Sequence, residues 1–314
     1  MTELQTVLIA GGSGTLGQAL ADDLADRGHD VVVLSRRPGR GRHRQVEWDG
    51  RTVGVWAREL DEPDRTAVVN LAGRLVDVRP TTANIASLRE SRVAPTRVLF
   101  EASRALDRPL ARWVQASTTA IWSDTGETRV TERTPVPTGA AALPQMTGVA
   151  VPWEQAAAAA HTRHLVILRP SIVLMPDSPA LDRLLSLARM FVGGRVGSGR
   201  QWFSWIHVDD WLAVVRSGLG LEPSMSVDGG VVVAASPNPV RNAELMAALR
   251  RTVHRPAAAP PTPARLVRLG AVALRTDPAL ALTGRHCTSD VLRYNGFRFG
   301  HPDLHEALAD LLER

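Results

Sequence analysis

The sequence predicts a doubly wound α/β protein, with a parallel sheet of the Rossmann type and a smaller, mostly helical C-terminal substrate region. Six short apolar segments alternate with helical segments over the first 170 residues, and a glycine cluster joins the first apolar segment to the first helical one. At 314 residues, of which 44% are hydrophobic and 22% charged, the chain has the apolar mass for one large domain, alone or with a small appendage.

The first 35 residues predict a βαβ unit. Thr6 to Ala10 is an apolar, β-branched run typical of a buried strand, and leucines then recur at helical spacing over Leu16 to Leu24. Gly28 ends that helix and Asp30 to Ser35 supplies the next strand. A right-handed crossover makes this strand pair parallel.

The same alternation predicts the later elements. Further strands are expected at Arg44 to Trp48, Ala67 to Leu71, Arg112 to Ala116, His164 to Leu168 and, rejoining the sheet late, Val231 to Ala235. Helices are expected at Ala83 to Ala105, Pro152 to Thr162, Ala180 to Met190 and Asn242 to Val253, with a passage from strand to helix at Phe203 to Arg216.

This rhythm sets the expected domain boundaries. Residues 1–174 form the predicted cofactor domain, to which 203–236 return, whereas 175–202 and 237–314 form the substrate-side and C-terminal helical region. The proline-rich segment Ala257 to Pro263 is the best candidate linker. For the helical tail of about fifty residues that follows, we hypothesise packing over the cleft.

The glycine cluster predicts a binding turn for a dinucleotide. Gly11, Gly14 and Gly17 form a Gly-x-x-Gly-x-x-Gly pattern between strand and helix. They would permit a tight turn, close approach of a cofactor and close packing of the helix, while amides around Thr15 and Leu16 meet a diphosphate. The alternative is a turn of the same shape that binds nothing.

The end of the second strand favours NADP(H) over NAD(H). An NAD site usually offers a carboxylate there, but this chain reads Ser35-Arg36-Arg37, a pattern suited to a 2′-phosphate. More arginines follow at Arg40, Arg42 and Arg44. The alternatives are a solvated basic loop and an arm for nucleic acid.

Composition excludes several chemistries. The chain has no lysine, so a Schiff base and a phosphate-loop lysine are impossible. The single Cys287 cannot form an intrachain disulfide. The first residues do not combine a basic flank with a long apolar run of the secretory kind, and no window of about 18 uninterrupted apolar residues occurs, so we expect neither a leader nor a membrane span. We therefore expect a cytoplasmic protein without a membrane role, and we read the net charge of +5 as compositional bias.

Motifs along nearly the whole chain show a family resemblance. They are Asn70 to Gly73, Ser117, Trp153-Glu154, Leu168 to Leu174, Gly193-Gly194, Gly197 to Gln201, Ser204 to Asp210, Pro237 to Val240 and Gly296 to Phe299. With these motifs the chain resembles the extended short-chain dehydrogenase/reductases of the NAD(P)-dependent epimerase/dehydratase superfamily, in particular an atypical sugar-nucleotide-epimerase-like subgroup with an extra C-terminal region.

The resemblance implies a Rossmann cofactor domain and a smaller C-terminal region that closes over a cleft. It also implies an adenosine side lined by Leu71, Ala72 and Gly73, Asp49 near the adenine, and Pro170 to Ile172 near the nicotinamide. A homodimer is a further possibility at the level of the family.

One departure from the superfamily is decisive for mechanism. Its reductases use a Tyr-x-x-x-Lys pair, in which the lysine lowers the pKa of the tyrosine. The matching positions here are Met146 and Ala150, and the single tyrosine, Tyr294, lies near the C-terminus. Catalysis by the usual pair is excluded.

The remaining candidates for chemistry are few. They are Ser117, Thr119, Glu154 and His207. The hydroxyls would orient a carbonyl or hydroxyl group, whereas the carboxylate and imidazole can titrate. For His207 a helix N-cap with a satisfied imidazole is an equal alternative, because Asp209 and Asp210 precede an apolar helical run.

Substrate contacts are expected from Trp122 and Trp205, which could wall an apolar group, and from Arg200 and Gln201, which could clamp an anionic or polar one. Core packing and a structural bridge to a carboxylate are the alternatives. Neither a cluster with metal spacing nor an aromatic-basic alternation is present, so no metal and no nucleic-acid partner is expected.

These patterns predict an NADP(H)-dependent oxidoreductase or epimerase-like enzyme that acts on a small carbonyl or alcohol substrate without the Tyr-Lys pair. The missing acid and base favour an alternative, a non-catalytic NADPH-binding regulatory protein. A redox-neutral isomerase or dehydratase that retains its cofactor is the third possibility.

Overall fold

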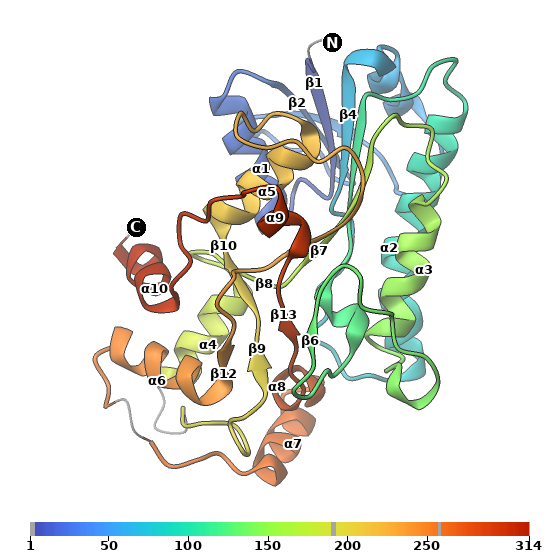
Figure 1. The fold of residues 1–314 in the computed structure, drawn as a ribbon. Helices are drawn as coiled ribbons and strands as arrows, with labels where there is room; N and C mark the ends of the chain where they lie inside the picture. Colours follow the sequence, from blue (N-terminus) through green and yellow to red (C-terminus); the bar gives the residue numbers. More distant parts are fainter. Residues whose placement is uncertain (1–3, 190–192, 257–258, 314) are drawn as a thin grey trace.

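The computed structural model describes residues 4–189, 193–256 and 259–313, which include a seven-stranded parallel sheet (Figure 1). Its strand order is β11-β7-β5-β4-β1-β2-β3. The bounds are β1 (Thr6–Ala10), β2 (Asp30–Ser35), β3 (Arg44–Glu47), β4 (Thr66–Asn70), β5 (Arg112–Ala116), β7 (Leu165–Pro170) and β11 (Gly230–Ala234). The predicted doubly wound α/β fold is confirmed, and the late strand joins one edge of the sheet.

Helices cover both faces of this sheet (Figure 1). One face carries α1 (Thr15–Asp26) and α5 (Val208–Leu219), and the other carries α2 (Thr82–Arg104) and α3 (Thr147–Ala157). Alternate residues of β1 serve the two cores: Val7 and Ile9 pack on the α1 side, whereas Leu8 packs on the α2 side. Burial on both faces explains why β1 and β2 contain nearly continuous apolar runs.

The boundaries of α3 differ from the prediction. The helix begins at Thr147 rather than at Pro152, and Pro152 lies in its interior. A proline has no N–H for the carbonyl four residues earlier, which is that of Gly148. The Arg89 guanidinium of α2 donates to this carbonyl at 3.1 Å, so a neighbouring helix satisfies the group that the proline leaves open.

Smaller elements complete the described chain around this sheet. The short strands pair as β8 (Ile172–Leu174) with β10 (Trp205–His207), β9 (Trp202–Phe203) with β12 (Val240–Arg241), and β6 (Arg129–Val130) with β13 (His286–Cys287). The 3-10 helices are η1 (Val55–Leu60), η2 (Pro63–Arg65), η3 (Thr119–Trp122) and η4 (Gly139–Ala141).

The remaining helices are α4 (Pro179–Arg189), α6 (Asn242–Thr252), α7 (Ala264–Ala273), α8 (Ala279–Leu282), α9 (Asp290–Tyr294) and α10 (Leu304–Glu313). Helices α4, α6, α7 and α8 lie together below the sheet (Figure 1). The predicted helical tail is thus four short helices interrupted by β13. Met190, where the predicted helix ended, and the first two residues of the predicted linker, 257 and 258, lie outside the described residues.

The loop between α9 and α10 is hydrogen-bonded to the sheet domain through Asp210, near the start of α5. Its buried carboxylate accepts the backbone N–H of Gly300 at 2.6 Å and that of His301 at 3.0 Å. Among the helices of the described ranges, none has the length and apolarity that crossing a membrane requires.

Candidate functional site

The turn between β1 and α1 requires its glycines. Gly11 has a φ of +80°, and a Cβ there would lie 2.8 Å from the backbone of Leu71 and Ala72. At Gly17 a Cβ would lie 2.5 Å from the Gly11 carbonyl oxygen, so helix and turn are in direct backbone contact. A Cβ at Gly14 would meet only that same oxygen, at 3.4 Å. The space above Gly14 is therefore open to a ligand.

The amino end of α1 suits an anion. The helix begins at Thr15, with Gly14 as its N-cap. Within the described chain, no side chain caps this end and its first turn carries no acidic residue. The first N–H groups of the helix, around Leu16, point out of the turn with the positive end of the helix dipole.

The end of β2 presents unpaired cationic groups beside this turn. Ser35 is buried, and its hydroxyl accepts the N–H of Arg37 at 3.2 Å. Arg36 and Arg37 are exposed, and among the described residues neither forms an ion pair. Arg42 and Arg44, by contrast, bind acidic side chains of α1 and η1.

Asp49 lies in the loop after β3, and its carboxylate is hydrogen-bonded to residues of the same loop. Its carboxylate accepts the N–H groups of Arg51 at 2.7 Å and Thr52 at 2.8 Å. These backbone hydrogen bonds hold the pKa of Asp49 below its usual range. The residue shapes the loop beside the expected adenine position.

The parallel sheet gathers the other expected contacts along one edge. Residues at the carboxyl ends of β2, β1, β4, β5 and β7 follow one another in that order across the sheet. They are Ser35, Gly11, Leu71 with Ala72 and Gly73, Ser117, and Pro170 with Ile172. A dinucleotide laid along this edge would span from Ser35 to Pro170.

A buried polar network fixes the loop after β4. The Asn70 amide donates to Thr96 at 2.8 Å and Gln115 at 3.0 Å, and its oxygen accepts the N–H of Ala72 at 3.1 Å. Full satisfaction of a buried amide holds the loop in a single conformation.

Ser117 and Glu154 are in direct contact. The Ser117 hydroxyl donates to a Glu154 carboxylate oxygen at 2.5 Å, and the Arg169 guanidinium binds both carboxylate oxygens at 2.8 Å. Arg169 itself lies over the ring of Trp122, 4.9 Å from its centre. All these side chains are largely buried, so the serine is held in one orientation.

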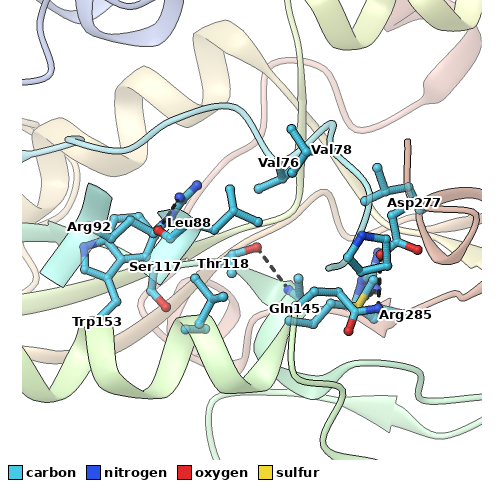
Figure 2. A pocket seen from close by; sticks show the side chains of 16 residues that line it. Val76, Val78, Leu88, Arg92, Ser117, Thr118, Gln145, Trp153, Asp277 and Arg285 are labelled. Atoms are coloured by element: carbon cyan, nitrogen blue, oxygen red, sulfur yellow. Dashed lines mark hydrogen bonds between the residues drawn. The ribbon is translucent and has the colours of Figure 1, made fainter. Parts of the chain in front are cut away.

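A pocket of about 260 Å³ opens beside this serine (Figure 2). Met146 and Ala150, the positions that match the usual Tyr-Lys pair, line it together with Ser117. Its walls come from α2, α3, the loop at Val76 to Pro80, and the C-terminal segment at Asp277 to Arg285. The C-terminal region thus helps to form the pocket.

Sequence reasoning missed the polar lining of this pocket. Arg92, Gln145, Asp277 and Arg285 all line it and were not singled out. The only sequence signal is Arg92, a charged residue on the buried face of α2 where apolar side chains are the rule. The other three lie in irregular segments without a periodic pattern.

Thr119 and His207 have structural partners. The Thr119 hydroxyl donates to the Pro170 carbonyl at 3.2 Å. His207 is fully buried and is the N-cap of α5, with Nδ1 accepting the Asp209 N–H at 3.1 Å. Neither residue is among the described residues that line the pocket. For His207 the structure shows the N-cap arrangement.

The side chains of His207, Asp209, His301 and Asp310 also form a cluster whose ligand atoms lie within 4.8 Å of one another. Since Nδ1 of His207 accepts a hydrogen bond, a neutral imidazole carries its proton on Nε2, which faces Asp310 at 3.2 Å. A metal in this cluster would have to bind at Nε2 and displace its proton, while Nδ1 is already occupied by the backbone hydrogen bond. The cluster therefore fits a hydrogen-bonded helix cap better than a metal site.

The expected substrate contacts also lie elsewhere. Trp122 and Trp205 are buried, and their indole N–H groups donate to backbone carbonyls. Arg200 is exposed near Glu127, and the Gln201 amide donates to two backbone carbonyls. Within the described chain, none of the four lines the pocket.

Fold and turn together define an α/β protein of the nucleotide-binding Rossmann type. Comparison with known proteins is consistent with this class: the sequence model of the NAD dependent epimerase/dehydratase family matches residues 7–217, and a domain of unknown function, DUF1731, matches residues 262–311. The chain belongs to the NAD dependent epimerase/dehydratase family.

The reported relatives cover nearly the full length of the chain. Epimerase family protein Mb2239 of Mycobacterium bovis is 33% identical over 311 residues, which is 96% of each chain. The crystal structure of human epimerase family protein SDR39U1 with NADPH has a TM-score of 0.82 and 28% identity, and covers 99% of this chain and 100% of that one. The crystal structure of a nucleoside-diphosphate sugar epimerase from Corynebacterium glutamicum has a TM-score of 0.75 and 27% identity. The match covers 99% of this chain and 58% of that one.

Proposed function

We propose that this protein is an NADP(H)-dependent oxidoreductase or epimerase-like enzyme acting on a small carbonyl or alcohol substrate. The observation that carries the proposal is the shared edge of the sheet: the open glycine turn and the pocket beside Ser117 lie along the same line of strand ends. The similarity to a human protein crystallised with NADPH supports it.

The described residues fit NADP(H). The amides at the start of α1 would hold the diphosphate above Gly14, and the unpaired Arg36 and Arg37, with Ser35, would hold a 2′-phosphate. In this arrangement Ser117 and Pro170, at the ends of β5 and β7, would flank the nicotinamide end. When bound, the cofactor supplies or accepts a hydride.

In this proposal residues 1–174 and 203–236 carry the cofactor, while 175–202 and 237–314 shape the substrate side. The position of Asp277, Leu280 and Arg285 in the pocket lining supports this division.

Ser117 would exchange the proton of the reacting oxygen. Its hydroxyl hydrogen is directed at Glu154, so its lone pairs are free to accept a hydrogen bond from a substrate hydroxyl. As an alcohol is oxidised, its proton would pass to Ser117 Oγ while the serine proton passes to Glu154. Arg169 holds the carboxylate in place through both of its oxygens.

Replacing Ser117 with alanine is expected to lower kcat about a hundredfold, because the proton loses its positioned acceptor. The dissociation constant for NADPH should change by less than about twofold, since the hydroxyl is not needed for the diphosphate or the 2′-phosphate. Steady-state kinetics and calorimetry measure the two values. Ser217→Ala is the matched control, because Ser217 is a buried serine that donates only to the carbonyl of Ala213 in its own helix. Equal kcat values for the two variants would contradict the role of Ser117.

Replacing Glu154 with glutamine is expected to lower the free energy of unfolding by about 3 kcal/mol, because the buried Arg169 loses the one anionic partner that it has among the described residues. Denaturant titration measures this loss. The double variant Glu154→Gln, Arg169→Met should recover part of it, since no buried charge is then unpaired. A Glu154→Gln variant as stable as the parent would contradict the assigned ion pair.

A non-catalytic NADPH-binding protein is the second candidate, favoured by the two non-titrating side chains, Met146 and Ala150, that line the pocket. Incubation with NADPH and a panel of ketones, quinones and sugar nucleotides, followed by the absorbance of reduced nicotinamide, separates the candidates. Turnover excludes the non-catalytic role. Inversion of a sugar nucleotide without net consumption of cofactor would identify redox-neutral chemistry.

A further inference from the structure

Arg92 is a buried cation in the wall of the pocket. It lies in the middle of α2, its residue is 9% exposed, and its guanidinium stands over the ring of Trp153 at 5.1 Å. It donates to the carbonyls of Leu88 at 3.1 Å and Arg74 at 2.9 Å, and to the hydroxyl of Ser91 at 3.3 Å. Within the described ranges no carboxylate pairs with it.

A buried cation of this kind lowers the stability of the protein when no ligand is bound. Neutral dipoles compensate it only in part, and three hydrogen bonds leave two of its five N–H groups without an acceptor from the described residues. Burial, with a smaller effect from the nearby Arg74, lowers the pKa of Arg92 to about 10, so the group is still charged at neutral pH. The two remaining N–H groups and the positive charge would suit an anionic partner.

The opposite wall holds a second cation (Figure 2). The Arg285 guanidinium donates to the Ser123 carbonyl at 2.7 Å, and burial lowers the pKa of this arginine as well. Asp277 lines the same wall, but its carboxylate is held by Gln145 at 3.1 Å and by the N–H of Ala279 at 2.9 Å. The charged lining is thus two guanidinium groups and one carboxylate, a net positive charge.

Apart from the uncharged polar residues Ser117, Thr118 and Gln145, the rest of the lining is apolar. Leu88, Val149 and Trp153 flank Arg92, and Val76 and Leu280 stand on other walls. A ligand that complements this pocket has an apolar body and a single acidic group.

We propose that this pocket selects a small substrate with an apolar body and a carboxylate or phosphate group, and that Arg92 binds the acidic group. The inference rests on the proposed function in taking the pocket as the substrate site. The same chemistry could come from the diphosphate of the cofactor, so the test has to separate these two sources.

The experiment is calorimetric titration of protein saturated with NADPH, using two pairs of probes that match in size and differ in charge. The pairs are benzoate with benzamide, and phenyl phosphate with phenyl methanesulfonate. We expect at least one anion to bind about tenfold or more tightly than its neutral partner, because a hydrogen-bonded buried charge discriminates strongly. If neither anion is preferred, the proposal is overturned.

Variants of Arg92 test whether this residue causes the preference for anionic probes. Arg92→Met should abolish it and leave the dissociation constant for NADPH within about twofold. Arg97→Met is the matched control, since Arg97 is an exposed arginine of the same helix. Should Arg92→Met not fold, Arg92→Gln keeps a donor for the two carbonyls and removes the charge. A preference that survives in the folded variant overturns the role of Arg92.

The two sources of anion then give different results. If loss of the Arg92 charge weakens NADPH binding tenfold or more, the diphosphate is the partner and the substrate assignment is overturned. If the parent protein binds no NADPH, the proposed function fails, and the probe pairs titrated into the free protein still test the anion site.

Discussion

Replacing Arg36 with glutamate is expected to weaken NADPH binding by more than about a hundredfold. The variant removes charge-assisted hydrogen bonds to a 2′-phosphate, each worth about 1.5 to 3 kcal/mol, and adds a repulsive carboxylate. Arg36 is exposed and unpaired among the described residues, so little compensation from the protein is available. NADH lacks the 2′-phosphate, and its affinity should change by less than about threefold. Calorimetry with both cofactors gives the ratio.

Arg42→Gln is the control for a general effect of charge in this loop. Arg42 already binds the carboxylates of Asp22 and Asp26, so its loss should change NADPH affinity by less than about twofold. Unchanged NADPH affinity in Arg36→Glu, or an equal loss for both cofactors, would contradict the assignment of the 2′-phosphate site.

Replacing Gly17 with alanine is expected to lower the free energy of unfolding by about 3 kcal/mol and to abolish measurable NADPH binding. The added methyl would lie 2.5 Å from the Gly11 carbonyl oxygen and 2.5 Å from the Gly12 Cα. Both are backbone atoms that cannot rotate away, so helix α1 and the turn must separate. Denaturant titration and calorimetry measure the two effects.

Gly14→Ala is the matched variant. Its methyl would meet only the Gly11 oxygen, at 3.4 Å, and the backbone there is extended with a φ of −81°, which alanine adopts readily. Stability should therefore change by less than about 0.5 kcal/mol, while NADPH affinity falls about tenfold or more because the methyl occupies the approach to the amides. A Gly14→Ala variant that binds NADPH normally would place the diphosphate elsewhere.

The strands could be predicted well because their signals are local. β1, β2 and β5 have the predicted bounds. In β1 and β2 the signal is a continuous apolar run, as expected of a parallel strand buried on both faces. The start of α3 could not be predicted, because Pro152 is usual in the first turn of a helix. Only the tertiary hydrogen bond from Arg89 explains its interior position.

The site divides in the same way. The glycine turn is one contiguous segment, and so is the Ser35-Arg36 pair at the end of β2. Each could therefore be recognised from its local sequence. Ser117 and Glu154 were each candidates, but they are 37 positions apart and their contact depends on how α3 packs against β5. Arg285 lies still further along the chain, in an irregular segment, and its burial follows only from the path of the C-terminal region.

The order of the elements along the chain has a consequence for biosynthesis. The last strand of the central sheet, β11, ends at Ala234, whereas the outer wall of the pocket comes from Asp277 to Arg285. A nascent polypeptide on the ribosome can therefore complete the sheet and the glycine turn before that wall has been translated. Since domains generally fold as they emerge, we expect the sheet and its glycine turn to form first, and the pocket beside them to be completed only after the C-terminal segment has been synthesised.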